Sequence, residues 1–326
     1  MDIRDRRAFK EEAAEILSHY PAQKKLVLIW AGVSAVLSVV ASIVSLLLDS
    51  QIEGTGGLSG IGLRSALSTL QSALFLGITV VLPFWNFGYQ AAVLKMARKE
   101  PAPPATLLHG FRLFVPVLLL VIFQSLIFAG LTMACIYGGT LVLSFTPLAN
   151  PFNQFILENE SAFLTGAVSE ELVMAMVESM LPVLAGCAVF ALVVIIPVFY
   201  KLRFANFCLM DAPQYGAITA LRVSGLLMKK NRISLFKLDL SFWWFYLAQI
   251  LLMGITNVES ILPVLGINMN FDLSASFGFY LGAMILELAL FYACHNHVQV
   301  SYAVFYNSLR DQLAESRQPT SHVDIP

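Results

Sequence analysis

Residues 114–143 read FVPVLLLVIFQSLIFAGLTMACIYGGTLVL, and this uninterrupted apolar stretch decides the fold. It carries no charged side chain, and it is longer than the ~20 residues that a helix needs to cross ~30 Å of hydrocarbon. Inside a bilayer every backbone N–H and C=O must be hydrogen-bonded within the protein, and the stretch lacks the alternating pattern of a β-barrel strand. The sequence therefore predicts a transmembrane helix at these residues.

Further apolar stretches on both sides of this one predict the same kind of helix. They are residues 26–48, 67–94, 180–200, 238–256 and 277–297. The chain of 326 residues is 58% hydrophobic and only 13% charged, which lies outside the range of soluble globular domains. We therefore predict an all-α fold, a polytopic membrane helical bundle with six transmembrane helices, and we exclude a soluble enzyme.

The basic residues are divided unevenly between the two sides of this predicted bundle. All of the 20 Lys and Arg residues except Arg64 lie in the terminal tails or in segments 95–112 and 201–237. Because basic loops stay in the cytosol, this distribution predicts the cell (cytoplasmic) membrane, with both termini cytoplasmic. The predicted parts are an N-terminal amphipathic segment (1–25), a transmembrane domain (26–310) and a cytoplasmic tail (311–326).

Short amphipathic helices are predicted on the cytosolic membrane surface before each pair of spans. In segment 3–20, one helical face carries Phe9, Ala13, Ile16 and Leu17. A similar segment follows the proline-rich break at 101–104. A third follows Asp211 and places four residues on one side: Ile218, Leu221, Gly225 and Met228. The order of surface helix, outward span and inward span suggests a parallel repeat of helical hairpins.

The long outer loop between the third and fourth spans contains a helix start. Ser169 can cap the first turn of a helix, and Glu170 and Glu171 follow it. Acidic residues are favourable there because the N-terminal end of a helix carries a partial positive charge. We expect a short helix on the outer surface that runs into the fourth span.

Glu287 stands at the middle of the sixth predicted span. A charged group costs roughly 2.5 kcal/mol or more at that depth and should face protein or water. If the last two spans pair antiparallel, Gln249 lies level with Glu287, because both helices rise ~1.5 Å per residue. Gln124 follows Arg112 at the spacing with which Gln249 follows Lys237. These three residues form a candidate mid-membrane polar site, and the alternative for Glu287 is a structural, hydrogen-bonded carboxyl.

The same antiparallel register sets Asp239 level with His297 at the cytoplasmic edge, where it predicts a carboxylate–imidazole pair. His295 and His297 point about 200° apart on a helix, so they do not predict a metal site. The sequence contains no HExxH, G-x-S-x-G or P-loop motif, and its cysteines form no CxxC pair. We therefore expect no enzymatic activity, no metal and no cofactor.

Arg222, Lys229, Lys230 and Arg232 lie in or directly after the third predicted surface helix. Such a group attracts anionic lipid headgroups, by up to about 1 kcal/mol per charge. Membrane lipids of the cytoplasmic face are therefore the predicted partners, although topology alone would also explain these charges. Binding to a protein partner and formation of a homo-oligomer are both left open by the sequence. Nucleic acid is not expected, because the net charge is −1.

Four segments carry a resemblance to a known family. They are KMARKEPAPPATLLHGFRLF from Lys95, IIPVFYKLRFANFCLMDAPQYGAITAL from Ile195, SGLLMKKNRISLFKLDLSFWWF from Ser224 and VSYAVFYNSLR from Val300. Together they resemble an uncharacterised family of six-span integral membrane proteins of Gram-positive bacteria, a domain of unknown function. The chain departs from the family's pattern at residues 295–297, where His-Asn-His replaces a Gly-rich, Pro-containing stretch. The resemblance covers roughly residues 1–310 and implies six spans and a bacterial membrane, but no catalytic residue.

Two functions are compatible with these features. The first is a non-enzymatic membrane protein with a lipid-organising, partner-binding or transport-accessory role in the cell envelope. The alternative is a small-solute or peptide permease that works through the polar site around Glu287. A water-accessible path to Glu287 would distinguish the permease from the first function.

Overall fold

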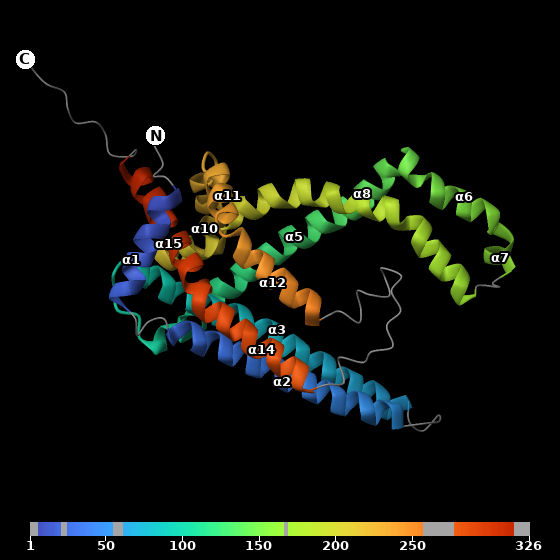
Figure 1. The fold of residues 1–326 in the computed structure, drawn as a ribbon, viewed down its shortest axis with the longest axis horizontal. Coiled ribbons are helices and arrows are strands. Elements are labelled where there is room, and N and C mark those ends of the chain that lie inside the picture. Colours follow the sequence, from blue (N-terminus) through green and yellow to red (C-terminus); the bar gives the residue numbers. More distant parts are fainter. Residues whose placement is uncertain (1–5, 21–24, 55–60, 166–168, 257–276, 316–326) are drawn as a thin grey trace, which may run out of the picture. The chain divides into compact units, whose positions relative to one another are not determined.

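The computed structural model describes residues 6–20, 25–54, 61–165, 169–256 and 277–315 (Figure 1). Every regular element in these ranges is helical, which confirms the predicted all-α class. The chain divides into two compact units: Met1–Leu118 together with Phe204–Pro326 form unit 1, and Leu119–Arg203 form unit 2.

The longest helices are apolar: α2 (Lys25–Gly54), α3 (Ile61–Ala97), α5 (Phe114–Leu143) and α8 (Glu170–Leu202). α5 has the bounds that the sequence predicted. In the described residues, three helices are long and apolar enough to cross a membrane. A fourth is added if α11 (Arg232–Leu240) and α12 (Trp243–Thr256) form one bent span. These helices indicate a membrane protein, and the count of six spans stays a prediction.

The core of unit 1 lies where the ends of several helices meet. Its buried side chains come from α1 (Arg6–His19), the last turns of α3, α9 (Ala205–Asp211), α10 (Gly216–Leu227) and α15 (Asn296–Glu315). The shorter elements of this unit are η3 (Pro104–Leu108), α4 (His109–Arg112), η5 (Pro213–Tyr215), α14 (Phe277–Leu290) and the π-helix η6 (Phe291–His295). By contrast, only 6% of the most apolar part of α3 is buried inside the chain.

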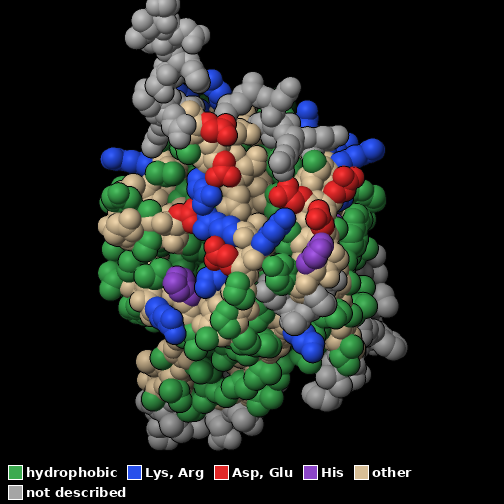
Figure 2. Space-filling view, turned by 90° about the vertical axis from the view of Figure 1, so that its left-hand side faces the viewer, with side chains coloured by type: hydrophobic (Ala, Val, Ile, Leu, Met, Phe, Trp, Pro, Cys, Tyr) green, Lys and Arg blue, Asp and Glu red, His purple; other side chains and the backbone are tan. Residues whose placement is uncertain are grey.

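Charged side chains gather at the same end of unit 1 as this core. Figure 2 looks onto the end where α1 and α15 lie, and it shows Lys, Arg, Asp and Glu side chains interspersed there with hydrophobic ones around them. A water-facing end of a membrane protein has this mixed surface, because charges are costly at membrane depth.

α1 forms where the amphipathic N-terminal segment was predicted, and the predicted apolar face is the buried one. Phe9, Ala13, Ile16 and Leu17 are each at most 6% exposed. They pack against α15, where the rings of Phe9 and Phe305 meet edge to face at 5.2 Å. The prediction that this face lies on the membrane surface is therefore wrong. Burial against α15 removes its apolar area from water, so no lipid is needed to cover it.

α10 is the helix predicted after Asp211, and its small side chains are buried. Ala217, Ala220 and Ser224 face the core, whereas Ile218 is 54% exposed. The small inward side chains allow α10 to pack closely against its neighbours, α9 and α15. On the predicted apolar side, Ile218 is exposed, whereas Met228, directly after α10, is fully buried. That side is therefore divided between the surface and the core.

The end of α3 crosses the η3–α4 segment with the two backbones in contact. A Cβ atom added to Gly88 would lie 1.7 Å from the carbonyl oxygen of Leu107, and one added to Gly110 would lie 2.1 Å from that of Phe84. Only glycine fits at such a crossing, because it has no Cβ atom. The rings of Phe84 and Phe114 stack beside it at 4.8 Å. This contact fixes the end of α3 against the start of α5.

Unit 2 consists of most of α5, η4 (Pro147–Ala149), α6 (Asn150–Glu158), α7 (Glu160–Thr165) and α8. α8 begins as predicted: Ser169 Oγ accepts a hydrogen bond from the Leu172 N–H at 3.2 Å, and Glu170 and Glu171 follow. The helix runs unbroken from there through the fourth predicted span. Ala149, Val183 and Cys187 form a small buried cluster, with Leu143 packed against it.

Candidate functional site

Asp211 is the centre of a polar cluster at the edge of the unit 1 core. Arg98 Nη2 donates to both carboxylate oxygens of Asp211, at 2.7 and 2.9 Å. The Tyr306 hydroxyl donates to Asp211 Oδ2 at 2.8 Å, and Arg310 Nη1 lies 3.5 Å from the same atom. Arg98 Nε also donates to Asn307 Oδ1 at 3.3 Å. We call these five residues the Asp211 cluster.

Three helices position the Asp211 cluster. Asp211 is the last residue of α9, which ends before Pro213 because proline lacks the N–H that a helix needs. Arg98 follows α3 in a helix cap where the Glu100 N–H donates to the Lys95 carbonyl at 2.9 Å, and where Lys99 has φ 60°. The other members lie on α15. The cluster therefore ties the ends of α3 and α9 to α15 through charge-assisted hydrogen bonds.

The chemistry of the Asp211 cluster suits a structural clamp. Both carboxylate oxygens already accept hydrogen bonds, and the Arg98 and Asp211 side chains are only 25% and 19% exposed. Burial raises the pKa of Tyr306 well above its usual value near 10, and the neighbouring Cys208 and Asp211 raise it further. The Tyr306 hydroxyl therefore stays protonated and donates at neutral pH. These contacts hold the Asp211 carboxylate in one orientation between the ends of three helices.

A second polar cluster lies at the junction of α11 and α12, and it contains Asp239 and His297, which were predicted to pair. The Tyr302 hydroxyl donates to Asp239 Oδ1 and also hydrogen-bonds the Tyr246 hydroxyl. His297 Nε2 donates to the Lys10 carbonyl oxygen at 2.9 Å. Asp239 and His297 thus lie at the same junction with different hydrogen-bond partners, and a direct contact between them stays a prediction.

Lys10 of α1 contacts the two residues at the break between α11 and α12. Its ammonium group donates to the Ser241 carbonyl oxygen at 3.3 Å and lies 4.5 Å from the centre of the Phe242 ring. A helix that ends leaves carbonyl groups without intrahelical partners. Lys10 satisfies one of them and adds a cation–π contact.

The residues of the predicted mid-membrane site lie in both units. Gln249 is half-buried on α12, and Glu287 is exposed on α14, which packs against α12. Gln124 is half-buried on α5 in unit 2. A common polar layer of these three residues stays a prediction.

The predicted lipid-contacting residues differ in exposure. Arg222, Lys229 and Lys230 are exposed, whereas Arg232 is half-buried at the start of α11. The Nε atom of Arg232 is buried and has no hydrogen-bond partner among the described residues. Three of the four cations are therefore accessible to a ligand.

An aromatic cluster beside the π-helix η6 was not predicted. Trp30 stacks on Tyr89 at 4.6 Å and on His295 at 5.0 Å. The buried Tyr89 hydroxyl donates to Asn296 Oδ1 at 2.8 Å. π-Helices often occur at functional sites, and this one lies where the His-Asn-His run had marked a departure from the family pattern.

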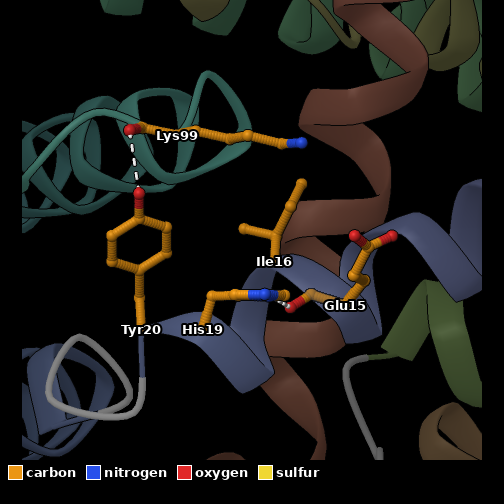
Figure 3. A pocket seen from close by; sticks show the side chains of 5 residues that line it. All are labelled: Glu15, Ile16, His19, Tyr20 and Lys99. Atoms are coloured by element: carbon orange, nitrogen blue, oxygen red, sulfur yellow. Dashed lines mark hydrogen bonds between the residues drawn. The ribbon is translucent and has the colours of Figure 1, made fainter.

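A pocket of about 120 Å³ opens between the end of α1 and the turn after α3 (Figure 3). The Tyr20 hydroxyl donates to the Lys99 carbonyl oxygen at 3.1 Å on one side of it. Its other lining residues are Glu15, Ile16 and His19. Small-molecule sites usually measure about 300–1,000 Å³, so this pocket is too small for one. In the ranges that the structure describes, no three His, Cys, Asp or Glu side chains could hold a metal ion.

Residues 1–313 match the family described as protein of unknown function (DUF975). The chain belongs to this DUF975 family. The match confirms the resemblance that the four segments indicated and extends over nearly the whole DUF975 chain. No curated protein and no solved structure matches it.

The four segments that resemble the family meet at the two polar clusters of this DUF975 chain. Arg98, Asp211 and Tyr306 come from the first, second and fourth segments and form one cluster. Asp239 and Tyr302 come from the third and fourth segments and form the other. The contacts between these four segments were not predicted from the sequence. The available signal was that Arg98 and Asp211 both stand next to a proline-marked helix end.

Proposed function

We propose that this chain is a six-span protein of the cytoplasmic membrane, with both termini in the cytosol. We further propose that it acts without catalysis, by organising anionic lipid at the inner leaflet of the cell envelope. The observation that carries this proposal is the construction of unit 1. Its packed core and its mixed charged surface share one end, while most of the apolar surface of α3 is exposed.

Two further features support a lipid role over an enzymatic one. The Asp211 cluster joins the ends of three helices through internal hydrogen bonds, which suits a structural role. Arg222, Lys229 and Lys230 are exposed, and their positive charges suit the phosphate groups of anionic lipids.

The protein is expected to be more stable in an anionic bilayer. Full-length protein is compared in nanodiscs of phosphatidylcholine alone and in nanodiscs with about one third phosphatidylglycerol. Three accessible cations at up to about 1 kcal/mol each should raise the thermal midpoint by roughly 5 °C. About 1 M salt should remove most of the difference, because the Debye length falls to about 3 Å. Equal midpoints in the two bilayers would contradict the proposed lipid role.

Glu287 gives a reason to consider the permease as a second candidate, because the residue is exposed on α14. A carboxyl group at mid-membrane depth needs water or a protein partner. Under the lipid role, a Glu287→Cys variant should react with a membrane-impermeant maleimide no faster than the wild-type chain, whose own cysteines set the baseline. Rapid labelling from either side, blocked by a prior impermeant thiol reagent, would favour the permease instead.

A further inference from the structure

α11 meets α12 at a sharp bend. Its axis is bent by 65° from that of α12, at the break around Ser241 and Phe242. If α12 follows the bilayer normal, α11 lies about 25° from the membrane plane, since 90° minus 65° is 25°. Transmembrane helices tilt by about 20° on average, which is compatible with a nearly in-plane α11.

α11 is amphipathic, and apolar side chains are exposed on its outer face. Leu235 and Leu238 are buried in the core, while Ile233, Phe236 and Leu240 are between 50% and 70% exposed. Positions i, i+3 and i+7 lie on one side of a helix. The three exposed side chains therefore form one stripe that points away from the core.

α10 adds a second exposed stripe of mixed character. Ile218, Arg222 and Leu226 follow one another at intervals of four residues, and all three are exposed. The opposite face of α10, with Ala217, Ala220 and Ser224, is buried in the unit 1 core. α10 therefore presents apolar side chains with a cation between them.

The surroundings of these stripes match the boundary between water and lipid. Trp243 and Trp244, directly after the bend, are 59% and 44% exposed. Tryptophan is enriched at membrane–water boundaries, where its ring is partly apolar and partly polar. Lys229, Lys230 and Lys237 are exposed beside the stripes. The only acidic residue of α10 and α11 is Asp239, which is half-buried and accepts a hydrogen bond from Tyr302.

We propose that α10 and α11 form a membrane-surface pad that binds anionic phospholipid of the inner leaflet. The pad consists of Ile218, Leu226, Ile233 and Phe236, with Lys229 and Lys230 between the two helices. This inference rests on the proposed lipid role and assigns that role to one surface.

The chemistry of the pad favours a lipid surface as its occupant. Its apolar side chains enter the boundary between headgroups and acyl chains, and its lysines contact the phosphates. A second copy of the chain would place lysines against lysines with no acidic side chain between them. Like charges in contact are unfavourable, whereas anionic headgroups complement the pad.

The charge of the pad is tested with the double variant Lys229→Gln/Lys230→Gln in the two nanodisc compositions. The pad variant should lose at least half of the midpoint rise that phosphatidylglycerol gives the wild type. The matched control is Arg6→Gln/Lys99→Gln, which removes two exposed cations of unit 1 outside the pad and should keep the full rise. If Lys229→Gln/Lys230→Gln keeps the full rise of the thermal midpoint, the proposed pad is contradicted. The lipid role would then belong to another surface.

The apolar side of the pad is tested by photo-cross-linking. Benzoylphenylalanine is placed at Phe236 in the full-length protein in nanodiscs, and at Ala14, which is exposed on α1, as the control. Position 236 should give a phospholipid adduct by mass spectrometry, and position 14 should give none. Cross-links from position 236 to a second copy of the chain, or equal lipid adducts at both positions, overturn the pad. A wild type without any phosphatidylglycerol effect overturns the lipid role itself.

Discussion

Gly88→Ala is expected to destabilise the core of unit 1 strongly. The new Cβ atom would lie 1.7 Å from the Leu107 carbonyl oxygen and 2.4 Å from the Leu107 carbonyl carbon. Both are backbone atoms, so no side-chain rotation can relieve the overlap, and α3 must move away from η3. Overpacking of a core typically costs about 1–3 kcal/mol. We expect a loss of about 3 kcal/mol or more here, because the obstacle is backbone.

The measurement for Gly88→Ala is thermal unfolding of the purified protein, with size-exclusion chromatography to report the folded fraction. Gly77→Ala is the matched control, because Gly77 lies on the same helix and has no atom within 4 Å of its added Cβ position. This control should unfold at the wild-type temperature or slightly above it, since alanine has the higher helix propensity. If Gly88→Ala and Gly77→Ala unfold at the same temperature, the close crossing of α3 and η3 is contradicted.

Asp211→Asn is expected to loosen the ends of α3 and α9 from α15. The amide keeps the size of the side chain but carries no negative charge, and its NH2 group replaces one of the two oxygens that accept from Arg98. Breaking a buried ion pair from one side costs about 3–5 kcal/mol. Both side chains are partly exposed, so we expect a smaller loss of about 2 kcal/mol after solvent screening.

The free energy of unfolding in denaturant measures this loss for Asp211→Asn. Asp311→Asn is the matched control, because Asp311 is exposed and contacts Arg310 without joining the cluster. An exposed substitution of that kind usually changes stability by about 0.5 kcal/mol or less. Arg98→Gln combined with Asp211→Asn should cost less than the sum of the two single changes, because one interaction is lost in both. Additive losses would show that the two residues are not coupled.

Features encoded in one stretch of sequence could be predicted, whereas features of assembly could not. The bounds of α5 and the capped start of α8 at Ser169 follow from an apolar run and a local hydrogen bond. The buried face of α1 was also correct, because periodicity identifies an apolar stripe. Periodicity does not identify what covers the stripe, so a membrane was predicted where α15 provides the contact.

In the candidate sites, too, contacts between distant segments could not be predicted from local sequence patterns. Arg98 and Asp211 are 113 positions apart, and neither lies on a pattern that points to the other. Gly88 and Gly110 looked like ordinary glycines, since only the crossing of α3 with η3 makes a Cβ atom impossible there. On α10, the buried residues Ala217, Ala220 and Ser224 had not been singled out by any pattern in the sequence. Packing between distant segments decides which small side chains are buried.

The pairing of α1 with α15 has a consequence for biosynthesis. α1 is synthesised before α15, and Phe305, which covers Phe9, is made only after every predicted span. His297, which binds the Lys10 carbonyl, is synthesised equally late. During translation the apolar face of α1 therefore lacks its final partner while the intervening helices enter the bilayer. The core of unit 1 can therefore close only on a chain that has been translated through α15.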